Sequence, residues 1–264
     1  MSAEIVERVL RSSRYRDVDR SLLARLADEE LPRSRNADDA VKRVKRRLHQ
    51  AVGAFRGASR PDAIQAAWSG SLTDGAFRAA CVEVLRTHAS TRERVPHLDG
   101  FYQRIWSLTG LPSGILDIGC GLNPLTLPWM GLSPRAVYVA SDVDRRPLAR
   151  VASFLDLVGQ PHAVEPRDLL SGPPPEHADV ALLLKLITTL DRQDPDVATR
   201  IVRSLRARHA VVSLPRSSLG GRGKRMERTY RQRIERLVAE AGRVSAVAEA
   251  SIPNELVFVL TLDG

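Results

Sequence analysis

The first 110 residues of the chain show the hydrophobic periodicity of helices. Apolar residues recur every three or four positions between charged ones, as at Ile5 and Val9 and again at Leu22, Leu23 and Leu26. This spacing places apolar side chains on one helix face, which a globular protein buries. We therefore expect an N-terminal helical part.

Residues 37–55 within this part predict a basic amphipathic helix. Val41, Val44, Leu48 and Val52 form its apolar stripe. The lysines and arginines between them would then lie mostly on the outer face, where they stay hydrated.

The pattern changes after residue 112 to strands that alternate with helices. Such alternation predicts a parallel sheet with right-handed crossover connections. The expected strands are 115–119, 136–141, 162–166, 178–184, 209–214, 244–251 and 255–262, and the expected helices are 146–158, 195–207 and 226–241.

The last two strands break this alternation. Only a short Pro-Asn turn separates residues 244–251 from residues 255–262, so these two strands must pair antiparallel. The change of pattern also predicts two domains, a helical extension over residues 1–110 and an α/β domain over residues 111–264.

The composition narrows the class of protein. A chain of 264 residues can hold one α/β domain and an extension. It has no apolar stretch of transmembrane length, and its N-terminus does not read as a secretory signal. Its two cysteines, Cys81 and Cys120, are too few for a disulfide framework or a zinc cluster. We expect a cytoplasmic protein without a metal.

The formal net charge of +9 is concentrated in two basic runs. Residues 41–47 hold five cations, and residues 216–236 hold eight cations against two acids. Taken alone, each run fits a solvated helix face as well as a binding surface. Together they favour a polyanionic substrate, since arginine pairs with phosphate in bidentate geometry.

The sequence ILDIGCGLNP, residues 115–124, carries the strongest sign of a ligand. An apolar strand ends in an acid and runs into a turn in which Gly119 and Gly121 allow close approach of the backbone to a ligand. Asn123 and Pro124 replace the third glycine of the usual dinucleotide motif, which favours S-adenosylmethionine (SAM) over NAD. With the closing hairpin, this predicts a Rossmann-like class I SAM-dependent methyltransferase sheet.

Acids follow the next two strands. Asp142 lies about twenty residues beyond the glycine turn, where an acid accepts the ribose hydroxyls of either SAM or NAD. The alternative is a cap on the next helix, a role that suits Asp144 better. Asp168 and Leu169 are candidates to receive the adenine, although Asp168 also fits a simple turn aspartate.

The sequence after the fourth strand limits the methyl acceptor. It has neither an Asn/Asp-Pro-Pro-Tyr motif for an exocyclic amine nor a Pro-Cys pair for attack on a pyrimidine carbon. An acceptor with a free lone pair, such as a purine ring nitrogen, then remains, and it needs alignment more than a general base. Lys185 is either a group that orients this target or a lysine that extends to solvent at the sheet edge.

Four segments together resemble one family. They are HASTRERV at 88–95, the glycine turn, SLPRSSLGGRGKRMERTY at 213–230 and PNELVFVL at 253–260. The family is that of the aminoglycoside-resistance methyltransferases, which modify N7 of a guanine in the decoding site of 16S ribosomal RNA. The resemblance extends over nearly the whole chain, including the helical extension.

The resemblance implies roles for individual residues. Arg92 would pair with the methionine carboxylate of SAM, and Glu255 would join Lys185 as a candidate for positioning the target guanine. Glu255 fits a charge at a strand end equally well, and Met226 fits a packing residue. The expected cofactor-binding residues are His88, Ser90, Arg92, Gly119, Cys120, Gly121, Asn123, Asp142, Asp168, Leu169 and Gln193. The expected RNA-binding residues are Lys42, Arg43, Lys45, Arg46, Arg47, Arg222, Lys224, Arg225 and Met226.

The implied substrate is the assembled small ribosomal subunit, and S-adenosylhomocysteine is the implied product of the cofactor. We expect a monomer with no membrane or DNA partner. Two other kinds of enzyme fit the residues less well: a methyltransferase of another rRNA position and one of a small acidic metabolite. A nonenzymatic RNA-binding protein with a Rossmann-like domain is a third alternative.

Overall fold

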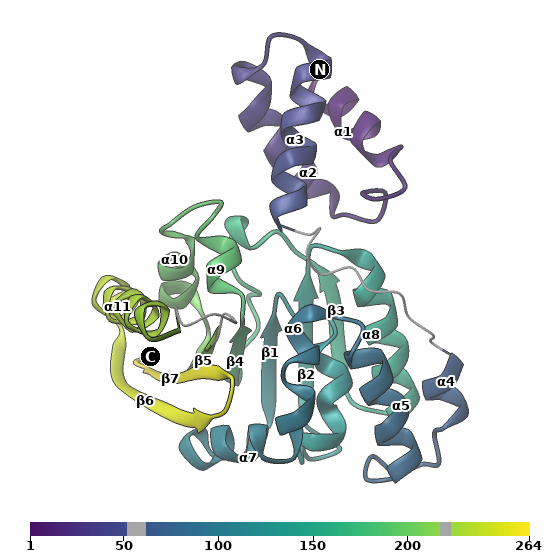
Figure 1. Cartoon of the computed structure of the whole chain (residues 1–264), viewed down its shortest axis with the longest axis vertical. Coiled ribbons are helices and arrows are strands. Elements are labelled where there is room, and N and C mark those ends of the chain that lie inside the picture. The colour runs from purple at the N-terminus through teal and green to yellow at the C-terminus, as the bar shows by residue number, and fades with distance from the viewer. Residues whose placement is uncertain (52–61, 217–222) are drawn as a thin grey trace.

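Seven strands form one mixed sheet in the part of the chain that the structure describes. The structure is a computed structural model and describes residues 1–51, 62–216 and 223–264. The strand order is β3-β2-β1-β4-β5-β7-β6, with β1 to β5 parallel and β7 antiparallel to both of its neighbours (Figure 1). The strands are β1 (Gly114–Ile118), β2 (Val137–Asp142), β3 (His162–Pro166), β4 (Ala178–Leu184), β5 (Ala207–Pro215), β6 (Val244–Ile252) and β7 (Glu255–Leu262).

The sequence predicted all seven strands with ends correct to within two residues. The antiparallel hairpin is confirmed, since Ile252 of β6 pairs with Glu255 of β7. The helix predicted over 195–207 was too long, because β5 already begins at Ala207. Strands such as β4 are nearly continuous apolar runs because helices bury both faces of the sheet.

Helices cover the two faces of the sheet and pack into two separate cores. One face carries α5 (Gly75–Leu85), α7 (Leu98–Thr109) and α8 (Arg145–Val158), and the other carries α9 (Ile187–Leu190), α10 (Val197–Ser204) and α11 (Gly223–Ala241). Shorter helices are α4 (Asp62–Ala66), α6 (Ala89–Arg92) and the 3₁₀ turns η1 (Leu31–Arg33), η3 (Val95–His97), η4 (Asn123–Trp129) and η5 (Leu169–Ser171). None of the described helices is both long and apolar enough to span a membrane.

Three N-terminal helices form a separate bundle above the carboxyl ends of the parallel strands (Figure 1). They are α1 (Ser2–Leu10), α2 (Arg20–Glu30) and α3 (Ala37–Ala51), and their core includes the fully buried Val9, Leu23 and Leu26. Helices α5 and α7, which we assigned to the same extension, instead pack against the sheet. The predicted domain boundary at residue 110, between the helical extension and the α/β domain, stays a prediction.

The chain just before α2 fixes the N-terminal bundle to the loop that follows β2. The Asp19 amide donates to the Val143 carbonyl at 2.8 Å, and the Arg145 amide donates to the Asp17 carbonyl at 2.8 Å. The Arg146 guanidinium pairs with the Asp17 carboxylate. Because this loop directly follows Asp142, the bundle is attached next to the predicted ligand site.

The pattern of the basic helix α3 predicted that its cations lie mostly on the outer face, and in the structure two of them pair with the neighbouring helix instead. Lys42 and Arg46 are exposed. Arg43 instead pairs with Glu30 of α2 at 2.7 Å, and Arg47 pairs with both Glu29 and Glu30. The pattern identifies the apolar stripe but not the acids on the neighbouring helix. Residues 52–55 of the predicted helix lie outside the described part of the chain.

Candidate functional site

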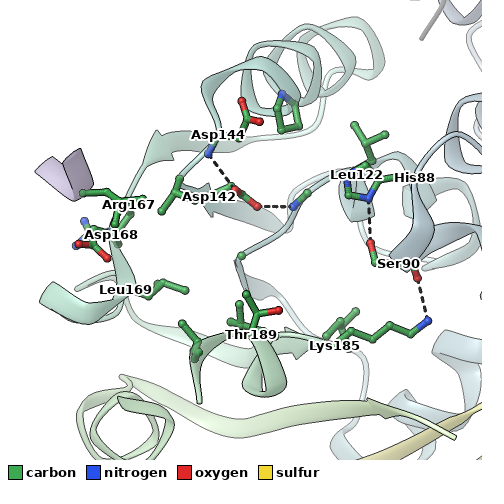
Figure 2. A pocket seen from close by; sticks show the side chains of 18 of the residues that line it. His88, Ser90, Leu122, Asp142, Asp144, Arg167, Asp168, Leu169, Lys185 and Thr189 are labelled. Atoms are coloured by element: carbon green, nitrogen blue, oxygen red, sulfur yellow. Dashed lines mark hydrogen bonds between the residues drawn. The ribbon is translucent and has the colours of Figure 1, made fainter. Parts of the chain in front are cut away.

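A pocket lies at the carboxyl ends of β1, β2 and β4, where ligands bind in open α/β sheets. Its volume is about 210 Å³. The glycine turn, the residues after β2 and β3, the segment at His88 and Ser90, and the end of β4 line it (Figure 2). Leu22 of α2 also lines it, so the N-terminal bundle forms part of the wall.

The glycine turn and Asp142 hold each other in place. Gly119 and Gly121 adopt φ angles of +65° and +51°, in the left-handed region that favours glycine. The Gly121 amide donates to Asp142 Oδ2 at 2.9 Å, and the Asp144 amide donates to Asp142 Oδ1 at 3.0 Å. Burial raises the pKa of Asp142, and these backbone donors oppose the rise. The carboxylate therefore faces the pocket in a fixed orientation.

The sequence left open whether Asp142 caps the next helix, and the structure gives this capping role to Asp144. It is the N-cap of α8, and its side chain accepts from the Arg146 amide at 3.1 Å. Asp142 therefore remains available to a ligand.

Asp168 lies on the pocket wall and also makes a turn. Its carboxylate accepts from the Leu170 amide at 3.1 Å, as the turn-aspartate alternative required. Asp168 and Leu169 are both buried and both line the pocket. The sequence did not indicate that Arg25 of α2 would donate to Asp168, with Nε 2.6 Å from Oδ2.

The opposite wall is built around α6. His88 Nδ1 and Ser90 Oγ are 3.0 Å apart, and burial lowers the pKa of His88 to about 4, so its ring is neutral at pH 7. Lys185, in the left-handed conformation with φ +56°, reaches across from the end of β4. Its Nζ donates to the Ser90 carbonyl at 3.1 Å and to Glu93 Oε2 at 2.6 Å. Lys185 therefore ties this wall to the sheet.

A buried polar network lies behind the glycine turn. Arg94 donates to both carboxylate oxygens of Glu255, at 3.0 and 2.9 Å, and to Asn123 Oδ1 at 2.7 Å. Asn123 Nδ2 in turn donates to Asp117 Oδ2 at 2.9 Å, and Tyr138 donates to the same oxygen at 2.6 Å. Burial would raise the pKa of Glu255, but the Arg94 and Lys185 charges outweigh it and hold this pKa below the ordinary value.

The structure brings most of the predicted cofactor residues together, but three do not line the pocket. Arg92 is exposed on α6, and Cys120 is a buried free thiol. Asn123 belongs to the network behind the turn. Gln193 does line the pocket, and its Oε1 is buried with no hydrogen-bond partner among the described residues.

The predicted RNA-binding residues lie on two separate helices. Lys42, Arg43, Lys45, Arg46 and Arg47 all belong to α3, above the carboxyl ends of the strands. Lys224 and Arg225 belong to the first turn of α11, where Met226 is half-buried. Arg222 lies outside the described residues.

The strand order, the closing antiparallel hairpin and the pocket beside the glycine turn define a class I methyltransferase fold. A model of the family described as ribosomal RNA methyltransferase (FmrO) matches residues 11–259. The chain belongs to this family.

Relatives and solved structures match along nearly the whole chain. The 16S rRNA (guanine(1405)-N(7))-methyltransferase of Frankia casuarinae is 40% identical over 262 residues, which is 96% of this chain and 91% of that protein. The protein of the same name from Micromonospora rosea is 38% identical over 97% of this chain and 95% of its own length. The crystal structure of the 16S rRNA methyltransferase RmtF with S-adenosyl-L-homocysteine has a TM-score of 0.84 and 31% identity, and covers 99% of this chain and 98% of that chain.

Replacing Gly119 by alanine should destabilise the protein more than the same change at Gly131. Both residues have φ +65°, so an alanine at either position must adopt the same unfavourable φ angle. A Cβ at Gly119 would lie 2.6 Å from Leu186 Cδ1, whereas one at Gly131 meets no atom within 4 Å. We expect Gly119→Ala to cost about 1–3 kcal/mol more in urea unfolding. Equal losses would mean that Leu186 moves aside freely.

The pH dependence of stability tests the buried network. Burial raises the pKa of Asp117 to about 6, compared with about 4 for an unfolded aspartate. Between these values the folded state holds a proton that the unfolded state has lost, so stability falls as the pH rises from about 4 to about 6. Asp117→Asn should remove this contribution, which approaches about 1.4 kcal/mol per pH unit.

Urea unfolding at several pH values measures that slope. Asp28→Asn, at an exposed position on α2, is the matched control and should keep the wild-type slope. An unchanged slope in Asp117→Asn would show that Asp117 is ionised throughout this range.

Proposed function

We propose that the protein transfers a methyl group from SAM to N7 of guanine 1405 of 16S rRNA in the small ribosomal subunit. One observation carries the proposal: relatives named for this reaction match 96% and 97% of the chain, a span that includes both the pocket and the basic helix α3. The product from the cofactor is S-adenosylhomocysteine, with which the RmtF structure is in complex.

The pocket residues suit SAM. The left-handed glycine turn exposes backbone beside Asp142, and a Cβ added to Gly121 would come within 3.4 Å of the His88 ring. A side chain there would therefore narrow the pocket. Gln193 offers a buried amide oxygen that has no partner among the described residues, which is a reason to expect a polar ligand.

We assign the ribose hydroxyls to the Asp142 carboxylate and the adenine to Asp168 and Leu169. The methionine end of SAM would lie against the wall at His88 and Ser90. Arg92 does not line the pocket, and its pairing with the methionine carboxylate stays a prediction. Because His88 is neutral at pH 7, it can accept a hydrogen bond without repelling the cofactor's positive charges.

SAM, when bound, supplies a methyl group on a positively charged sulfur. The guanine N7 already carries a lone pair, so no residue has to remove a proton before the transfer. The task of the protein is to align the nucleophile and to exclude water. Lys185 and Glu255 keep their predicted role in positioning the target, although the buried pair with Arg94 already engages Glu255.

The α3 surface supplies the contact with the rRNA phosphates. Lys42 and Arg46 are exposed and can bind phosphate at no cost to the fold, whereas Arg43 and Arg47 already hold the bundle together. The guanine would be turned out of its stack to reach the pocket, at a cost of a few kcal/mol.

The modification explains resistance to aminoglycosides. A methyl group on N7 gives the guanine a fixed positive charge and removes an acceptor from its Hoogsteen edge. A polycationic drug that donates to this edge then meets electrostatic repulsion and a steric clash.

The modified nucleotide can be identified directly. Ribosomal RNA from a strain that expresses the protein, treated with borohydride and aniline, should be cleaved at guanine 1405, and primer extension should stop there. RNA from a strain that expresses Gly119→Ala should show less cleavage. A stop at another guanine would mean that the protein methylates a different nucleotide. The absence of a stop at any guanine would contradict N7 methylation.

Charge reversal on α3 tests the docking surface. The double variant Lys42→Glu, Arg46→Glu should bind small subunits at least about tenfold more weakly and with a shallower salt dependence. Its affinity for SAM should not change. Sedimentation with small subunits and calorimetry with SAM measure the two effects separately.

The matched control places the same charge change at the opposite edge of the sheet. Arg135 and Arg208 are exposed beside the starts of β2 and β5. The double variant Arg135→Glu, Arg208→Glu should bind subunits like the wild type. An equal loss in both double variants would mean that net charge, not the α3 surface, controls binding.

A further inference from the structure

A contact between Arg25 and Asp168 joins the N-terminal bundle to the pocket wall. Arg25 of α2 donates to Asp168 with Nε 2.6 Å from Oδ2 and Nη2 3.4 Å from Oδ1. The side chain of Asp168 is 2% exposed and that of Arg25 is 20% exposed. A charge pair with this little solvent is much stronger and better oriented than a surface pair.

The donors around Asp168 leave part of its carboxylate open. Oδ1 accepts from Arg25 and from the Leu170 amide, whereas the described residues give Oδ2 a hydrogen bond from Arg25 only. A carboxylate oxygen accepts about two hydrogen bonds, so Oδ2 keeps one acceptor site. Because Asp168 lines the pocket, this site is available to a donor group of the ligand.

Arg25 is itself held in place. Its Nη1 donates to Glu29 Oε1 at 2.7 Å, one turn further along α2, and Glu29 also pairs with Arg47 of α3. Burial alone would lower the pKa of Arg25, but the hydrogen bonds to Asp168 and Glu29 raise it above its ordinary value. The guanidinium is therefore a fixed positive charge beside Asp168.

The attachment of the bundle does not depend on this contact. The backbone bonds between Asp17, Asp19 and the loop after β2 would remain without Arg25, as would the Arg146–Asp17 pair. A purely structural role for Arg25 would duplicate these contacts. Arg25 adds a fixed orientation of the Asp168 carboxylate on the pocket wall.

We propose that Arg25 is a positioning residue for the adenine of the cofactor. It holds the Asp168 carboxylate in an orientation in which Oδ2 accepts from the adenine amino group, while Leu22 of the same helix lines the pocket. The N-terminal bundle is thereby part of the cofactor site as well as the RNA-docking surface. The inference rests on the proposed function, because it requires a cofactor that contains adenine.

Calorimetry with two ligands tests the proposal on the full-length protein. S-inosylhomocysteine differs from S-adenosylhomocysteine in having a carbonyl oxygen in place of the adenine amino group and a proton on the neighbouring N1. The wild type should bind the inosine compound at least about tenfold more weakly, since an oxygen cannot donate to Asp168. Arg25→Gln should bind S-adenosylhomocysteine about tenfold more weakly and the inosine compound with little change, so that the ratio of the two affinities shrinks.

Three further variants separate positioning from folding. Arg20→Gln removes a charge from an exposed position of the same helix, and Asp17→Asn loosens the attachment of the bundle, so both should keep the wild-type ratio. Arg25→Lys retains the charge but not the two-pronged geometry and should give an intermediate ratio. It replaces Arg25→Gln if that variant does not fold.

The possible results are distinct. Equal losses for both ligands in Arg25→Gln, or none, would overturn the proposal in favour of a structural contact. A wild type that does not distinguish the two ligands would remove Asp168 as the acceptor. A wild type that binds neither ligand would instead contradict the proposed function itself.

Discussion

The buried ion pair between Arg94 and Glu255 holds the candidate site together. Arg94 follows α6, which carries the His88 wall, and Glu255 begins β7, so the pair fixes one side of the pocket to the sheet. Both side chains are only 2% exposed, and the Phe101 ring lies 4.4 Å from the guanidinium. Loss of either partner would leave an uncompensated buried charge, which costs roughly 3–5 kcal/mol. The wall that carries His88 therefore depends on both Arg94 and Glu255.

The pocket is assembled from parts of the chain that are far apart in sequence, and the residues after β3 and the end of β4 also line it. The ends of β1 and β2 supply the glycine turn and Asp142, the segment around α6 supplies the opposite wall, and α2 supplies Leu22. Different kinds of bond fix these parts: backbone amides hold Asp142, Lys185 bridges to the Ser90 carbonyl, and a charge pair joins Arg25 of α2 to Asp168 after β3. The pocket and the N-terminal bundle that carries the basic helix α3 are therefore neighbours, joined by direct contacts.

The sequence predicted the sheet and the pocket floor because their signals are local. Strands buried on both faces read as apolar runs, and a glycine turn followed by acids at strand ends needs no distant residue to be recognised. The contact between Arg25 and Asp168 spans 143 positions and follows no spacing rule. The inward pairing of Arg43 depended on Glu30 of another helix, which periodicity alone does not reveal.

The separation of Arg94 and Glu255 by 161 positions has a consequence for biosynthesis. At about 5–20 residues per second, a ribosome makes Glu255 roughly 10–30 s after Arg94. During that interval Arg94 lacks its charge partner, so packing the segment around α6 against the sheet would bury an uncompensated charge. A nascent chain therefore carries an open, incomplete pocket until β7 has been made and has paired with β5.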